Sequence, residues 1–310
     1  MASNRVAALT SSEPVGVLRS WVPGAGAGGE VGSVIVIAGY PIVPAGGASI
    51  DRMLHGIDHI VVACEDPDAT AAQLADEIGL AFTGGGRHPG AGTFNRLAFL
   101  ADEAYLELIG VADRREALGS PVGASALRAL DERGGGFASF AIRSDELDDD
   151  VTMLQATGAA LTDPLHGSRD GRDGERVEWW ISVPERLGPD GLPFLIRHAM
   201  VGREWGPDAL RERSEFEHPI GSPMRLVRLD IATDDPPSRA GDYVEQLGIS
   251  FRAVADLAVA QVGQHVIRLL PSREMTTVAT IVLAASVETP RSADIAGVRW
   301  DIEPVPVLAR

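Results

Sequence analysis

The sequence is short of several residue types, and each shortage excludes a class of protein. Its 310 residues include a single cysteine, Cys64, so no disulfide can form within the chain, and a reducing cytoplasm is the expected compartment. Basic side chains are also few, because 27 arginines, with no lysine, stand against 44 acidic residues, a formal net charge of -17. Such a charge repels nucleic-acid backbones and anionic membrane surfaces, so neither is an expected partner.

Long apolar runs and several catalytic motifs are missing too. The most apolar early run, residues 31–38, is far shorter than the roughly 20 residues of a membrane-spanning helix. The chain has no Gly-x-Ser-x-Gly motif, no dinucleotide fingerprint after a strand and no Gly-Lys-Ser/Thr phosphate loop. A small-molecule substrate is therefore the expected partner.

Residues 1–52 differ in character from the rest of the chain. They are rich in glycine and carry few large apolar side chains, which predicts a flexible extension that does not fold by itself. Because Met53 stands just before the first predicted strand, we also expect residues 1–52 to be an upstream extension of a reading frame that starts at Met53.

A pattern of strand, helix and three strands recurs after residue 53. In the first copy, an apolar strand at residues 56–64 precedes a helix that Asp66 caps and Gly79 ends. This self-similarity predicts an α+β fold of repeated βαβββ modules. The predicted units are a two-module domain at 53–222, with modules at 53–115 and 135–200, and a third, partial module with a C-terminal tail at 223–310.

The modules should pair, because a helix covers only one face of such a small sheet. Modules one and two would then enclose a cavity, and His59, in the middle of the first strand, would look into it. The third module, if left unpaired, would leave sheet surface exposed. That surface predicts a homodimer in which two third modules pair.

The chain resembles the vicinal oxygen chelate superfamily, and more narrowly its glyoxalase-like branch, over roughly residues 54–235. The segments that carry the resemblance are residues 56–62, 84–97, 105–108 and 192–196. Members of this superfamily build a cupped sheet from paired βαβββ modules, and many hold a divalent metal through a histidine of the first strand and a glutamate of the last. The resemblance implies His59 and Glu107 as the metal ligands, Glu107 as a catalytic residue, and Zn, Ni, Mn, Co or Fe as the ion.

Residue chemistry supports this ligand pair, although it leaves an alternative open. Imidazole and carboxylate suit these metals, and a buried carboxylate without a partner would be costly. The alternative is that Glu107 pairs with Arg96 or Arg197 and that His59 is an ordinary core histidine.

Module two departs from the pattern, because Ser139, or Ala138 if the register slips by one residue, stands where a histidine like His59 is expected, and Arg197 stands where a glutamate is expected. An arginine facing the cavity is a ready partner for a carboxylate or phosphate group. His88 and His198 are further candidate ligands. The glycine-rich loop around His88, and the orientation of His198 opposite to Arg197, favour other roles.

Four residues are predicted to contact the substrate. His88 and Asn95 belong to the glycine-rich loop at the mouth of the cavity, Arg197 would bind an anionic group, and one of two adjacent tryptophans, assigned as Trp179, would line the cavity. The leading functional hypothesis is a divalent-metal-dependent lyase, isomerase or dioxygenase acting on a small oxygenated substrate. The alternative hypothesis is a metal-free protein of the same fold that binds a small molecule for resistance or sequestration.

Overall fold

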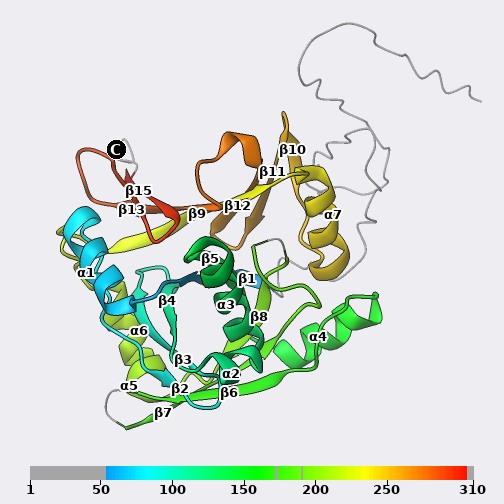
Figure 1. The fold of residues 1–310 in the computed structure, drawn as a ribbon, viewed down its shortest axis with the longest axis horizontal. Coiled ribbons are helices and arrows are strands. Elements are labelled where there is room, and N and C mark those ends of the chain that lie inside the picture. The colour runs from blue at the N-terminus through cyan, green and yellow to red at the C-terminus, as the bar shows by residue number, and fades with distance from the viewer. Residues whose placement is uncertain (1–53, 172–173, 190, 306–310) are drawn as a thin grey trace, which may run out of the picture. The chain divides into compact units, whose positions relative to one another are not determined.

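The computed structural model describes residues 54–171, 174–189 and 191–305 of the chain. The expectations for residues 1–52 and for a start at Met53 lie outside these residues. Two mixed sheets form the fold, one of eight strands in the order β2-β3-β4-β1-β5-β8-β7-β6 and one of seven in the order β10-β11-β12-β9-β13-β15-β14 (Figure 1). The predicted α+β fold of βαβββ-like modules is confirmed.

The first sheet contains the two complete modules. Module one consists of β1 (Leu54–Ala63), α1 (Pro67–Ile78), β2 (Arg87–His88), β3 (Thr93–Phe99) and β4 (Tyr105–Val111). Module two consists of β5 (Gly136–Ser144), α4 (Leu147–Ala156), β6 (Leu165–Asp170), β7 (Arg176–Ser182) and β8 (Phe194–His198). Helices α2 (Arg114–Leu118) and α3 (Pro121–Arg133), for which no element is predicted, lie between the modules, and α5 (Gly202–Trp205) and α6 (Pro207–Ser214) follow them.

The second sheet begins with the predicted third module and continues to the end of the described chain. The third module consists of β9 (Met224–Thr233), α7 (Pro236–Leu247), β10 (Arg252–Val254), β11 (Leu257–Val262) and β12 (His265–Pro271), after which comes a 3-10 helix, η2 (Ser272–Glu274). The remaining strands are β13 (Ala279–Ala285), β14 (Arg291–Ile295) and β15 (Val298–Pro304). Strand β13 pairs antiparallel with β9 as β5 pairs with β1. The chain therefore supplies by itself the strands that the dimer prediction assigned to a second copy, and the homodimer stays a prediction.

A capping aspartate begins, and a glycine ends, each of the helices α1 and α7. The side chain of Asp66 accepts hydrogen bonds from the backbone N–H groups of Asp68 and Ala69, both at 3.0 Å, and Gly79 ends α1 in the left-handed conformation. Asp235 and Gly248 bound α7 in the same way. At both helices the aspartate carboxylate pairs with otherwise unpaired N–H groups, as predicted for α1.

The two faces of the first sheet pack against different partners. On one face, Ile60 and the α1 residue Leu74 share a core with Leu229 and Ile267 of the second sheet. On the other face, Val61 packs with alanines of α3. The second face is the one that borders the cavity described below. Across the described ranges, none of the helices combines the length and the apolar character that crossing a membrane requires.

Candidate functional site

The candidate site is a cavity of about 370 Å³ enclosed by the first sheet. Its lining comes from strands β1, β3, β4, β6, β7 and β8 and from the start of α3, so both modules contribute to it. The sheet curves far enough that its edge strands, β2 and β6, lie beside each other. His59 and Glu107 are both buried in the cavity wall, 3% and 6% exposed.

An irregularity in β1 brings two consecutive polar residues to one place. Opposite β5, Ile57 pairs with Ile142 and His59 pairs with Ala141, so Asp58 is an extra residue without a partner in the register. Such a β-bulge re-aims side chains that would otherwise alternate between the two faces of the sheet. Asp58 and His59 can therefore reach the same cluster.

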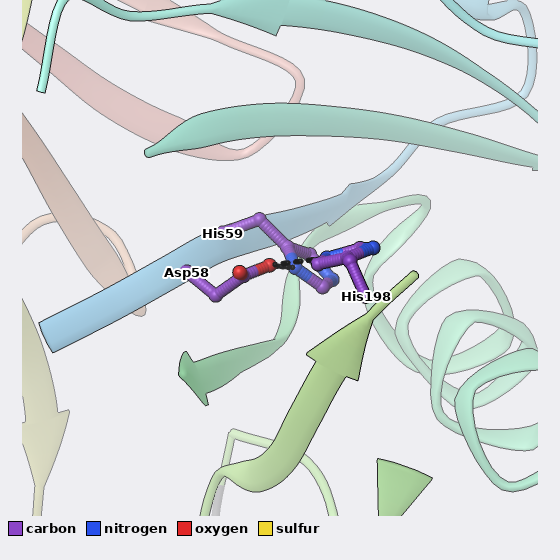
Figure 2. Close-up of side chains that lie close together, drawn as sticks. All are labelled: Asp58, His59 and His198. Carbon is purple, nitrogen blue, oxygen red and sulfur yellow. Dashed lines mark hydrogen bonds and ion pairs between the residues drawn. The ribbon is translucent and has the colours of Figure 1, made fainter. Parts of the chain in front are cut away.

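Asp58 lies between two histidines. Its Oδ1 is 2.7 Å from Nδ1 of His59 and 3.1 Å from Nε2 of His198, which comes from β8 (Figure 2). Burial by itself would raise the pKa of the Asp58 carboxyl, but His198 and His59 outweigh it and hold that pKa well below its usual range. An ionised carboxylate only accepts hydrogen bonds, so both ring nitrogens donate to it. In a neutral His59, Nε2 is then the nitrogen that carries the lone pair.

Aromatic rings hold both imidazoles in place. The His59 ring stacks on Tyr105 with centroids 4.4 Å apart and planes 16° apart, and the His198 ring stacks on Trp205 at 3.9 Å and 8°. Burial raises the pKa of the Tyr105 phenol well above its usual value, so the phenol keeps its proton. The imidazoles are therefore oriented before any ligand arrives.

Asn95 orients the Glu107 carboxylate. Its Nδ2 donates to Oε1 of Glu107 at 2.6 Å and lies 3.2 Å from Nε2 of His88, and its Oδ1 accepts from the N–H of Gly86 at 2.9 Å. Burial lowers the pKa of His88, although Glu107 opposes this, which favours the neutral ring, and its Nδ1 lies 2.8 Å from Oγ1 of Thr93. The second carboxylate oxygen, Oε2 of Glu107, is left to face His59.

The space between His59 and Glu107 suits a cation. Nε2 of His59 and Oε2 of Glu107 are 3.6 Å apart. While His59 is neutral, both atoms offer electron pairs and neither can donate to the other. Metal bonds of about 2.0–2.2 Å at a tetrahedral angle place two ligand atoms roughly 3.4 Å apart, close to this separation. The donor atoms therefore fit a first-row divalent metal ion.

Asp58, His59 and His198 form a second set of donors in the same place. One ligand atom from each residue lies within 4.8 Å of the others, and all three residues are buried. Two imidazoles and a carboxylate are donors that Mn, Fe, Co, Ni and Zn accept. This buried group can hold a metal ion, with His59 as the residue common to both sets.

The structure brings most of the predicted site residues together. The residues that line this one cavity are His59, His88, Asn95, Glu107 and Trp179. Arg197 is placed elsewhere, because its guanidinium stacks on Trp180 at 4.5 Å and its Nη2 lies 3.5 Å from Oδ2 of Asp148 on α4. His198 faces the cavity instead, which reverses the orientation predicted for these two neighbours.

Strand pairing explains why Arg197 does not correspond to Glu107. On β1, Val61 lies opposite Glu107, and the equivalent Ala141 on β5 lies opposite Phe194. Phe194, not Arg197, therefore stands at the position of a second glutamate, and the predicted equivalence of Arg197 is wrong. Arg197 also does not pair with Glu107, whose partners are Asn95 and His59.

Two residues of the site, Asp58 and Arg169, were not predicted, and a third, His198, was considered as a ligand but not assigned to the site. Asp58 and His198 complete the polar cluster, and Arg169 lines the cavity while its guanidinium pairs with Glu204 of α5. A signal for Asp58 is present in the sequence, since a carboxylate in a buried strand needs compensation. For His198, the spacing of four residues from Phe194 puts both side chains on one strand face. For Arg169 we find no signal.

Comparisons with known proteins place the fold. Residues 57–247 match the family model described as a glyoxalase-like domain. The structure is similar to that of a hypothetical protein from Staphylococcus aureus, with a TM-score of 0.66 at 16% identity over 80% of this chain and 99% of that chain. No curated protein matches the chain.

Two enzymes of known structure show weaker similarity. Methylmalonyl-CoA epimerase from Mycobacterium tuberculosis has a TM-score of 0.36 at 21% identity, over 47% of this chain and 88% of that chain. A mutant of 4-hydroxymandelate synthase from Streptomyces coelicolor has a TM-score of 0.46 at 13% identity, over 76% and 72%.

Proposed function

Since the chain belongs to the glyoxalase-like domain family, we propose that it is a divalent-metal-dependent enzyme of the lyase, isomerase or dioxygenase type, acting on a small oxygenated organic substrate. The observation that carries this proposal is the pair of opposed electron-pair donors in the cavity, Nε2 of His59 and Oε2 of Glu107, 3.6 Å apart. Their burial makes a cation between them favourable, because water screens the charge little there.

Each residue in and around the pair has a separate role. His59 and Glu107 would hold the ion, and the bound ion would act as a Lewis acid toward oxygen atoms of the substrate. Asp58 fixes the His59 ring by accepting from Nδ1, an arrangement that in metal sites sets the tautomer and strengthens the ligand. Asn95 orients Glu107 in a similar way, because its side-chain amide donates a hydrogen bond to the carboxylate. His198 either joins the ligands or keeps Asp58 in place, since its Nε2 bonds the same oxygen.

Metal content tests the proposal. We expect about one divalent ion per chain in protein purified without chelator from metal-replete growth, and its loss in His59→Ala. His55→Ala is the matched control, because His55 lies on the same strand but pairs with Asp145 outside the cavity. A wild-type chain that takes up no metal even on titration, or a His59→Ala variant that keeps it, would refute the proposal.

Metal affinities of two further variants, Glu107→Gln and His198→Ala, identify which residues bind the metal. Loss of a metal ligand or of the group that orients it typically costs 10–100-fold or more in affinity, so we expect Glu107→Gln to weaken binding at least about 10-fold. If His59, Asp58 and His198 are the ligands instead, His198→Ala should weaken binding strongly and Glu107→Gln only slightly. Isothermal titration of the apoprotein with Zn²⁺ and Mn²⁺ separates the two ligand sets.

A further inference from the structure

At the end of the cavity away from the buried His59 and Glu107, apolar side chains line the wall together with the polar Ser120, His166 and Ser168. The apolar residues at this end include Pro121, Val122, Leu165, Trp179 and Ile181. Leu165 is 41% exposed and Trp179 is half-buried, whereas the polar residues of the other end are buried. Among the described residues that line the cavity, Arg169 is the one lysine or arginine, and it is paired with Glu204. A ligand with a phosphate group would find no unpaired cationic side chain here.

Packing against Gly167 and His88 fixes the orientation of the Trp179 indole. It lies across Gly167, its cross-strand partner on β6, so closely that a Cβ at Gly167 would be 2.2 Å from the indole Nε1. The indole also packs against His88 in a T-shaped contact, with centroids 5.7 Å apart. A glycine is therefore needed opposite the indole, and the ring presents a flat apolar surface in one orientation.

This flat surface lies next to the polar cluster. Gly167 on β6, Trp179 on β7 and His198 on β8 form one row across the sheet. Neighbouring strands are about 4.8 Å apart, so the indole lies one strand from the histidine that bonds Asp58. A molecule with its oxygen atoms at the polar end has its next few atoms against Trp179.

We propose that the ligand of this cavity carries a planar apolar ring bonded directly to its oxygen-bearing carbon atoms, with the ring stacked on Trp179. The inference rests on the proposed function for the placement of the oxygen atoms. Planar rings pack on an indole face better than bulky aliphatic groups of similar size, and a cavity of about 370 Å³ holds one ring and its polar group.

Three α-hydroxy acids with the same polar group test the proposal. Mandelate carries a phenyl ring, hexahydromandelate a cyclohexyl ring and lactate a methyl group. Titration of the zinc-loaded protein should give the tightest binding for mandelate and the weakest for lactate. We expect Trp179→Ala to weaken mandelate binding roughly tenfold and lactate binding less than twofold, and Trp179→Phe to restore part of the loss.

Two further variants separate stacking from a general loss of structure. In Gly167→Ala, the added Cβ would clash with the indole of Trp179 and displace it. This variant should therefore lower the ratio of mandelate to lactate affinity, as Trp179→Ala does. Trp180→Ala is the matched control, because Trp180 is the next residue on β7 but faces Arg197 on the other side of the sheet. Its affinity ratio should equal that of the wild type.

The outcomes are distinguishable from those of the metal measurement. Equal affinity for mandelate and hexahydromandelate, no binding of any of the three acids, or an unchanged ratio in Trp179→Ala would overturn the ring proposal even if the protein holds metal. A preference for mandelate that depends on Trp179 supports the ring proposal. If that preference persists in protein that takes up no metal, the proposed enzyme function fails while the stacking site stands.

Discussion

The stability of the fold should depend on the neutral form of one buried histidine, His218. Its side chain is 2% exposed and bonds two backbone groups that are far away in the sequence. Nδ1 accepts from the N–H of Ala81 at 3.2 Å, and Nε2 donates to the carbonyl oxygen of Phe99 at 3.2 Å. A second proton would have to sit on Nδ1, against the N–H of Ala81. Burial, opposed by the bond to Phe99, lowers the pKa of His218 to about 4.

The sign and size of the effect follow from this pKa. The unfolded chain takes up a proton near the ordinary histidine pKa of 6.5, whereas the folded chain takes it up only near 4. The unfolded state therefore binds more protons between these values, and the folded state loses stability as the pH falls. The loss from this one group is about 2 kcal/mol at pH 5 and about 3 kcal/mol at pH 4, relative to pH 8.

Urea unfolding at pH 8, 6, 5 and 4 measures this loss against a matched variant. In His218→Gln, the amide oxygen can accept from Ala81 and the amide nitrogen can donate to Phe99, but the side chain does not titrate. The variant should be less stable than the wild type at pH 8, and the difference should shrink by about 2 kcal/mol at pH 5. Parallel stability curves for the two proteins would refute the reasoning.

Three further predictions concern other buried groups. Asn95→Ala removes the donor to Glu107 and should lower the free energy of unfolding in urea by about 1–3 kcal/mol. Burial raises the pKa of the Cys64 thiol to about 11, so at pH 8 the native protein should not react with Ellman's reagent, whereas the urea-unfolded chain should release one equivalent. Gly92→Ala should cost clearly more than Gly90→Ala in thermal unfolding. Both glycines have positive φ, but a Cβ at Gly92 would lie 2.3 Å from a backbone oxygen, while none lies within 4 Å at Gly90.

Local signals predicted the modules well, because each is complete within a few residues. The pairing of a capping aspartate with a terminal glycine, as in Asp66 and Gly79, depends on the chain near the helix alone. The strands β14 and β15 were missed. They alternate charged and apolar residues around a short turn, and no predicted helix precedes them to mark the start of a further module. The sequence therefore predicted three modules where the chain folds two full sheets.

The site was predicted only where a residue keeps the regular phase of its strand. His59 and Glu107 lie on the expected faces of β1 and β4. Asp58 was missed because the bulge depends on the register between β1 and β5, which the sequence of β1 does not contain. Because side chains alternate between the two faces of a strand, the sequence correctly placed Arg197 and His198 of β8 on opposite faces. Which of the two faces the cavity depends on the pairing of β8 with β5.

The order of strands also bears on how copies of this chain can associate. The outermost strands are β2 and β6 in the first sheet and β10 and β14 in the second. The strands β2 and β6 shield each other, β10 has three residues, all exposed, and β14 (Arg291–Ile295) presents exposed polar side chains at three of its five positions. Short and charged borders of this kind resist extension of a sheet from one molecule to the next. If the chain dimerises, the contact should therefore form through helices or sheet faces, and concentrated solutions should resist fibrillar aggregation.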